Sequence, residues 1–136
     1  MKDKELRELD AWIAKHVFGC KPKPIRIKDG RKTIRVEYHC LCNPSHAVGW
    51  SQIFKYSTDP AAAMMVLEKC CEHNTHGNYC CVTKSLPCDS MIDKKNGHWN
   101  VGVLDGEGMH IFGTSGNAKT LPLAICLFAK KLFTKA

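Results

Sequence analysis

Two periodicities of apolar residues alternate along the chain, and their order restricts the fold more than any other feature. Apolar residues recur at three- and four-residue steps in 3–18 and 121–132, the pattern of an amphipathic helix. They alternate with polar residues in 33–40 and 98–103, the pattern of a strand with one buried face. We therefore predict an α+β fold: a single-domain sandwich over residues 1–136, in which a mostly antiparallel sheet packs with three helices in the order α-β-β-α-β-β-β-α.

Turn and capping residues mark the ends of several of these elements. Asp29 and Gly30 predict a two-residue hairpin turn, since both residue types accept a positive φ. Asp59 predicts a helix cap, with Pro60 at the first helical position, where a missing N–H has no cost. The helix that follows, 61–72, is apolar around most of its circumference, so we expect it to be largely buried.

The composition is that of a basic globular protein. Of 136 residues, 44% are hydrophobic and 24% are charged, and Lys plus Arg exceed Asp plus Glu by 20 to 13. The resulting net charge of +7 favours anionic partners, which are nucleic acid, nucleotides or an acidic protein surface. No apolar run approaches the roughly 20 residues of a membrane span, and residues 1–5 lack the apolar core of a signal peptide, so we expect no membrane partner. Nine cysteines without a secretion signal predict reduced thiols rather than a disulfide framework.

Two segments resemble signatures of the phage ABA sandwich family. Residues 56–69 (YSTDPAAAMMVLEK) are similar to the aromatic-Ser-Thr-Asp helix start of that family, and residues 120–129 (TLPLAICLFA) to its T-x-P-x-A-I-C helix. Trp99 and the Phe18-Gly19 pair fit the same pattern. The resemblance implies a bacteriophage origin and the ABA-sandwich fold. Since no signal peptide and no membrane span are predicted, we expect the protein in the host cytoplasm. The family has no established general activity, so the resemblance implies no reaction.

The segment 113–120 (GTSGNAKT) has the spacing of a P-loop with one departure. Ala118 stands where the second glycine of the motif belongs, and a Cβ there opposes the backbone conformation that cradles phosphate. We do not predict a nucleotide triphosphatase, but we predict that Thr114, Ser115 and Lys119 hold a phosphate at a helix N-terminus without catalysis. The alternative is a flexible connection between a hairpin and the last helix.

A run of basic residues covers the predicted hairpin. It contains seven Lys and Arg between 21 and 35 and only one acidic residue, Asp29. Alternation along the strands would place several cations on one side, which suits phosphate groups. We predict that Arg26, Arg31, Lys32 and Arg35 bind an anion. The alternative is a solvated hairpin face.

Metal binding and catalysis have weaker support. Cys and His gather in 39–46 and 70–88, but no C-x-x-C knuckle occurs, so we predict no metal ligand and no cofactor and leave a zinc site open as an alternative. No nucleophile elbow and no paired-carboxylate motif occurs, and we predict no catalytic residue.

These observations favour binding over catalysis. Our leading hypothesis is a non-enzymatic, homo-oligomeric counter-defence protein that binds and sequesters a phosphate-bearing ligand, such as a nucleotide immune signal. One alternative is a phage inhibitor that docks on a host protein or nucleoprotein complex, as anti-CRISPR proteins do. Another is a small zinc-binding protein or a nucleotide hydrolase. The positive charge also permits nucleic acid as a partner.

Overall fold

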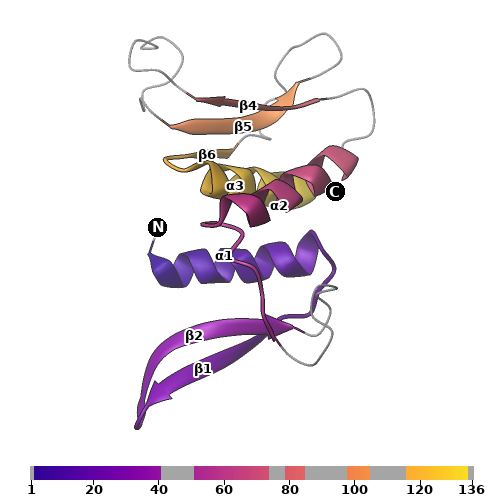
Figure 1. The fold of residues 1–136 in the computed structure, drawn as a ribbon. Coiled ribbons are helices and arrows are strands. Elements are labelled where there is room, and N and C mark those ends of the chain that lie inside the picture. The colour runs from indigo at the N-terminus through magenta and orange to yellow at the C-terminus, as the bar shows by residue number, and fades with distance from the viewer. Residues whose placement is uncertain (1, 41–50, 74–78, 85–97, 105–115, 135–136) are drawn as a thin grey trace.

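The computed structural model describes residues 2–40, 51–73, 79–84, 98–104 and 116–134 (Figure 1). Three helices and six strands follow one another along the chain: α1 (Asp3–His16), β1 (Lys23–Asp29), β2 (Lys32–Cys40), β3 (Ser51–Gln52), α2 (Pro60–His73), β4 (Tyr79–Lys84), β5 (Trp99–Leu104), β6 (Gly116–Ala118) and α3 (Leu121–Thr134). The predicted α+β class and the order of the longer elements are confirmed, and β3 adds a strand of two residues. None of the helices in the described ranges is long and apolar enough to cross a membrane.

The strands form two antiparallel sheets, and the helices lie between them (Figure 1). One sheet has the order β1-β2-β3 and the other β4-β5-β6. Helix α1 packs on β2 and on α3, while α3 packs on α2, β5 and β6. Helix α3 is therefore the central element, and α1 connects it to the first sheet.

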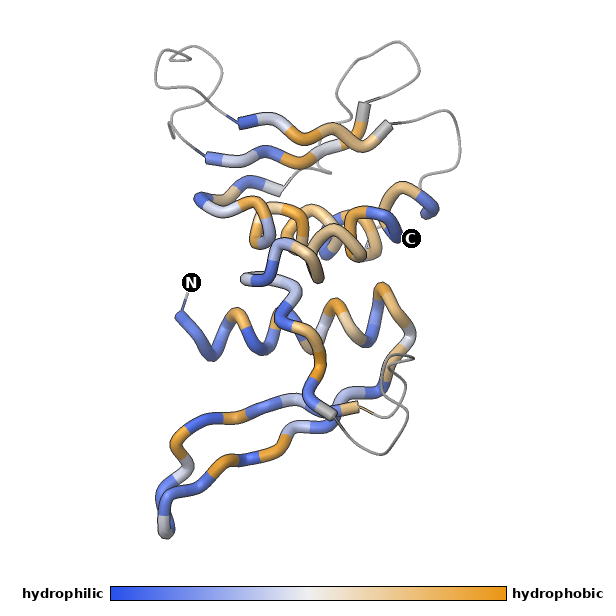
Figure 2. Tube along the Cα trace, viewed as in Figure 1, coloured by the Kyte–Doolittle hydropathy of each residue, from blue (hydrophilic) through white to orange (hydrophobic). Residues whose placement is uncertain are grey.

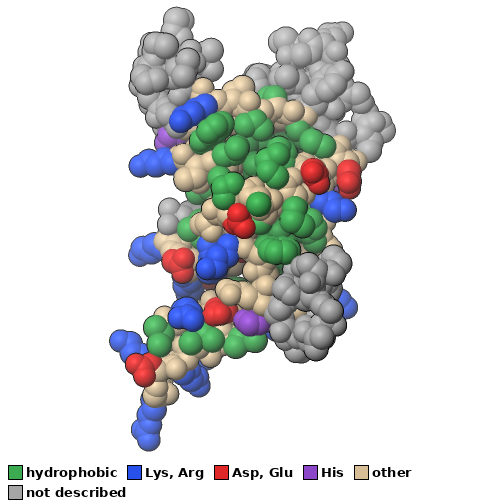
Figure 3. All heavy atoms as spheres, viewed as in Figure 1, with side chains coloured by type: hydrophobic (Ala, Val, Ile, Leu, Met, Phe, Trp, Pro, Cys, Tyr) green, Lys and Arg blue, Asp and Glu red, His purple; other side chains and the backbone are tan. Residues whose placement is uncertain are grey.

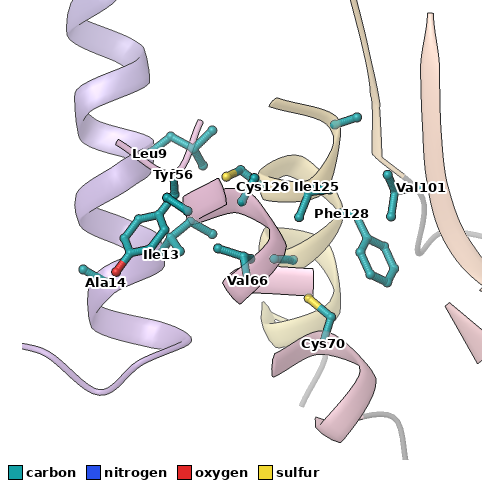
Figure 4. Packing of buried hydrophobic residues seen from close by; sticks show 14 of the residues in the cluster. Leu9, Ile13, Ala14, Tyr56, Val66, Cys70, Val101, Ile125, Cys126 and Phe128 are labelled. Carbon is teal, nitrogen blue, oxygen red and sulfur yellow. The ribbon is translucent and has the colours of Figure 1, made fainter. Parts of the chain in front are cut away.

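The core forms where α3 meets the other two helices and β5. Phe128 and Ile125 of α3 are fully buried, as are Ile13 of α1, Val66 of α2 and Val101 of β5 (Figure 4). The apolar stripe predicted for the last helix is thus the one that faces inward. Since α3 has neighbours on several sides, this stripe joins elements that are far apart in the sequence.

Helix α2 differs from the prediction, because only one of its faces is buried. Ala62, Ala63, Val66 and Cys70 face the core. Met64 is 47% exposed and Met65 is 41% exposed. The expectation of a largely buried helix was wrong because α3 covers one side of α2, and no described element covers the other.

The start of α2 is fixed by hydrogen bonds to α1. The Ala61 N–H donates to Asp59 Oδ1 at 3.1 Å, which confirms the predicted cap. The buried Ser57 N–H donates to Asp10 Oδ1 of α1 at 2.7 Å, and the Ser57 hydroxyl donates to the Leu6 carbonyl at 3.4 Å. The family-like segment around Ser57 therefore holds two helices together.

The β1–β2 hairpin forms as predicted but with a different turn and less burial. Asp29 pairs with Lys32, so the turn residues are Gly30 and Arg31. Gly30 takes φ +62°, which is the glycine-first pattern of a type II′ turn. The predicted buried face exists only near the base of the hairpin, where Cys40 is 2% exposed, whereas Ile34 is 58% exposed.

This difference follows from where the hairpin lies. Apolar and polar positions alternate along both of its strands, and its tip projects past α1 at the lower end of the molecule (Figure 2). Alternation alone cannot show where a supporting helix ends, and here only the half of β2 near Cys40 is covered.

Candidate functional site

The basic hairpin, residues 21–35, carries the highest density of positive charge in the described chain. All seven cations are exposed: Lys21, Lys23, Arg26, Lys28, Arg31, Lys32 and Arg35. Basic side chains surround its tip at the lower end of the view (Figure 3). The structure therefore makes this segment a projecting positive arm.

The strand register distributes these charges over both faces of the arm. Arg26 pairs with Val36, and paired residues of antiparallel strands point to the same side. Arg35 precedes Val36 and so points to the opposite side from Arg26. Arg31 lies in the turn, and Lys32 pairs with Asp29. The observed register, with a bulge between Ile27 and Lys28, therefore places cations on both faces of the arm.

A groove lies between α1 and β2, and Arg35 is the predicted site residue that lines it. The groove consists of two adjoining hollows of about 410 Å³ and 390 Å³, which share Asp3, Arg7, Arg35 and Val36. Ile34, Val36 and Tyr38 supply its apolar surface. Its charged side chains are four basic and three acidic: Lys4, Arg7, Arg35, Lys55, Asp3, Glu8 and Glu37.

This mixture of charges distinguishes the groove from an anion pocket. Arg35 Nε lies 3.4 Å from Glu37 Oε2, and Arg7 Nε lies 3.9 Å from Asp3 Oδ1. Each of these guanidinium groups thus has an acidic neighbour, which reduces its attraction for a phosphate. Arg7 and Lys55 are in this groove through tertiary packing, and no spacing in the sequence pointed to them.

Beneath the groove, Arg7 and Asp10 form a buried ion pair. Arg7 NH1 lies 3.1 Å from Asp10 Oδ2, and Arg7 NH2 donates to Thr58 Oγ1 at 3.2 Å. Asp10 is only 1% exposed. Burial raises the pKa of Asp10, while the hydrogen bonds from Ser57 and the charge of Arg7 act in the opposite direction. The pair fixes the position of Arg7 and faces the protein interior.

Part of the P-loop-like segment belongs to a strand. Gly116, Asn117 and Ala118 form β6, which pairs with β5. A Cβ on Gly116 would lie 2.2 Å from the Ala124 carbonyl oxygen and 2.5 Å from the Phe128 nitrogen, so this glycine allows strand and helix to pack closely. The predicted flexible connection was wrong for these three residues, because they belong to a sheet.

Of the predicted phosphate ligands outside the basic hairpin, the structure describes Lys119. Thr114 and Ser115 lie outside the described residues. Lys119 is exposed between β6 and α3, on the far side of α1 from the hairpin (Figure 1). Lys119 therefore lies in a different layer of the molecule from the basic hairpin.

The cysteines of the described residues are mainly packing residues. Cys126 is fully buried in α3. Burial, and to a smaller extent the neighbouring Cys80 and Cys71, raises the pKa of the Cys70 thiol to about 12. Among the residues that the structure describes, no three His, Cys, Asp or Glu side chains are grouped to hold a metal ion. Several predicted zinc candidates, Cys42, His46, His76 and Cys88, lie outside this part of the chain.

One polar cluster had no counterpart in the sequence analysis. His98 Nδ1 lies 2.9 Å from Asn117 Oδ1, and Asn117 Nδ2 donates to Asn100 Oδ1 across the paired strands β5 and β6. The three residues are separated by up to 19 positions, so only the strand register could have revealed them. The cluster links the two strands.

Comparison with known proteins assigns the chain to a family. The sequence pattern of the phage ABA sandwich domain matches residues 11–129. No curated protein and no solved structure matches the chain. The matched region includes the Ser57–Asp59 helix start and the buried stripe of α3, whose roles in the structure are capping and packing. The chain belongs to the phage ABA sandwich domain family.

Proposed function

We propose that this phage protein is a non-enzymatic binding protein that holds a phosphate-bearing ligand on its basic hairpin and thereby acts against host defence. The observation that carries the proposal is the concentration of seven exposed cations and one acidic residue in the projecting segment 21–35. Exposed guanidinium and ammonium groups are effective phosphate ligands. The family's association with phages supports a role during infection of a host cell.

The shape of the hairpin favours an extended polyanion over a single nucleotide. Arg26 and Arg35 point to opposite sides, and Arg31 occupies the tip, so one small ligand cannot contact all three. A nucleic-acid backbone presents many phosphates and can contact both faces of such an arm. A two-stranded β-ribbon also has the width to enter the major groove of DNA. We therefore place nucleic acid ahead of a nucleotide signal as the ligand.

The test is the salt dependence of binding to a short duplex DNA, a single-stranded RNA and a free mononucleotide. For duplex DNA, each phosphate contact contributes about 0.9 to the slope of log K against log salt concentration. Arg31→Ala and Arg26→Ala should each weaken binding and lower that slope by about 0.9. Lys15→Ala, which removes an exposed cation from α1, is the matched control and should leave the slope unchanged.

The same experiment separates the competing hypotheses. Equal affinity in the Arg26, Arg31 and Lys15 variants would rule out the hairpin as the binding surface. Tight, weakly salt-dependent binding of the mononucleotide alone would restore the nucleotide-signal hypothesis. A mononucleotide recovered chemically altered after incubation would favour the hydrolase.

A second candidate function, docking on a host protein, is favoured by the α1–β2 groove. Ile34 is 58% exposed beside Val36 and Tyr38, and charges of both signs surround them. Apolar surface with a polar rim is typical of protein interfaces. Ile34→Asp should abolish binding to a host protein that uses the groove while leaving nucleic-acid binding by Arg31 intact.

A further inference from the structure

Helix α2 is apolar around most of its circumference, yet it carries an exposed stripe along one side. Ala61, Met64, Met65, Glu68 and Glu72 recur at three- and four-residue steps and are all exposed. The opposite face buries Ala62, Ala63, Val66 and Cys70. A helix that is apolar on both faces is typically covered on both. Here the described elements cover only one.

Met64 and Met65 form the apolar centre of this stripe. They are 47% and 41% exposed, and hydrophobic side chains gather on the same face of the molecule at the level of α2 (Figure 3). Methionine side chains are flexible and polarisable, and they are frequent on helical binding surfaces. Exposed apolar patches of this kind mark sites of protein association.

We propose that α2 packs against α2 of a second copy of this chain, antiparallel and about a two-fold axis between Met64 and Met65. The two-fold symmetry places the methionines of both copies against each other, so one apolar patch serves as both halves of the interface. The proposal goes beyond ligand binding, because it concerns how the protein assembles.

The distribution of charge along the stripe selects the second copy and the antiparallel direction. The half that begins at Ala61 is uncharged, and Glu68 and Glu72 both lie in the other half. Parallel pairing would set these glutamates against their own copies, and like charges that face each other repel. Antiparallel pairing instead brings Glu68 level with the small Ala61 of the other copy.

The same arrangement brings charges of opposite sign together at both ends of the interface. In an antiparallel pair centred between Met64 and Met65, Lys69 of one copy comes level with Pro60 of the other, next to Asp59. Lys69 Nζ lies 3.4 Å from Glu72 Oε2 in its own helix, so its side chain is on the exposed side of α2. Two such Lys69–Asp59 approaches occur per dimer by symmetry.

The test is sedimentation equilibrium of the full chain over about a hundred-fold range of concentration, read as the dissociation constant of the dimer. Met65→Glu should weaken the dimer at least about 100-fold, because two carboxylates would be buried at the two-fold axis. Ile34→Glu makes the same chemical change at a more exposed apolar residue of the basic hairpin and should leave the dimer unchanged.

A second pair of variants tests the direction of pairing. Lys69→Glu should weaken the dimer by about fivefold, since it reverses two exposed charge approaches. Lys28→Glu, with the same change of net charge on the basic hairpin, should not weaken it. All four positions are exposed, so circular dichroism should report a folded protein in each case.

The proposal is overturned by a wild-type protein that stays monomeric throughout this range, or by a dimer that withstands Met65→Glu. A monomer would leave a host protein as the occupant of the stripe. A dimer that is weakened by Ile34→Glu in place of Met65→Glu would move the interface to the α1–β2 groove.

Discussion

At the scale of single residues, the most unusual group is the buried Asp10 carboxyl. It accepts the Ser57 N–H at 2.7 Å and lies 3.1 Å from Arg7, yet the net effect of its surroundings is a raised pKa, chiefly through burial. A folded protein that holds a proton more tightly than the unfolded chain loses stability as that proton leaves. Ionisation of Asp10 therefore disfavours the folded state.

The raised pKa of Asp10 predicts how the stability of the protein changes with pH. The contribution of Asp10 is fully present below the ordinary value of 3.8 and is lost as the pH rises through its raised folded pKa. Asp10→Asn removes the titration, so the free energy of unfolding of the wild type should fall relative to this variant as the pH rises from 3.8 to neutral. Urea unfolding across this range measures the difference. Glu8→Gln, at an exposed position of the same helix, should show no such trend.

Nothing local in the sequence identifies Asp10 as special. Its hydrogen-bond partner Ser57 lies 47 residues away, and Asp10 itself belongs to an amphipathic helix in which acidic residues are common. By contrast, the Asp59 cap was predicted, and the Asp29-Gly30 pair placed the hairpin turn to within one residue, because both depend on backbone geometry within a few residues. The sequence predicted interactions between residues that are close in the chain. It did not predict which distant residues meet in the folded protein.

At the scale of elements, the short strand β6 shows why a motif needs its structural setting. The spacing from Gly113 to Thr120 resembles a P-loop, but Gly116 pairs within a sheet, and a Cβ on it would lie only 2.2 Å from the Ala124 carbonyl oxygen of α3. We predict that Gly116→Ala destabilises the protein by about 3 kcal/mol, since backbone atoms cannot yield to the added Cβ as a side chain could. Thermal or urea unfolding measures the loss.

The neighbouring position supplies the control for β6. Asn117→Ala alters an exposed residue of the same strand and should lose less than about 1 kcal/mol through its hydrogen bonds. If Gly116→Ala were as stable as the wild type but bound a phosphate ligand more weakly, the glycine would serve a ligand rather than the packing of α3.

The periodicity of apolar residues predicted where the helices and strands lie. It did not predict which of their apolar residues are buried, because burial depends on the neighbouring elements. The stripe of α3 faces inward as expected, because α1, α2, β5 and β6 all pack against that helix. The equally apolar α2 leaves Met64 and Met65 exposed, and β2 leaves Ile34 exposed. The predicted hairpin cations are likewise all exposed, but their division between two faces depended on a register that the sequence does not contain.

At the scale of the whole molecule, tertiary packing decreases from α3 toward the tip of the basic hairpin. Val101 and Val103 of β5 are 0% and 2% exposed, and β5 lies between β4 and β6. The distal part of the hairpin, 26–34, contains no buried residue, and α1 adjoins it only at Thr33 and Ile34, across the groove. A two-stranded ribbon without such support is only marginally stable in water. The hairpin should therefore open far more often than β5.

Hydrogen exchange measured by mass spectrometry can test this gradient and its connection to binding. Amides of 26–34 should exchange early, and those of β5 should be among the last, because their opening requires loss of the core around Phe128. Saturating duplex DNA should slow exchange in the hairpin and leave β5 unchanged, since a ligand stabilises the segment that it orders. Slow exchange in 26–34 of the free protein would contradict the prediction. It would mean that another surface already covers the hairpin, and a dimer held together by α2 would then need a second contact there.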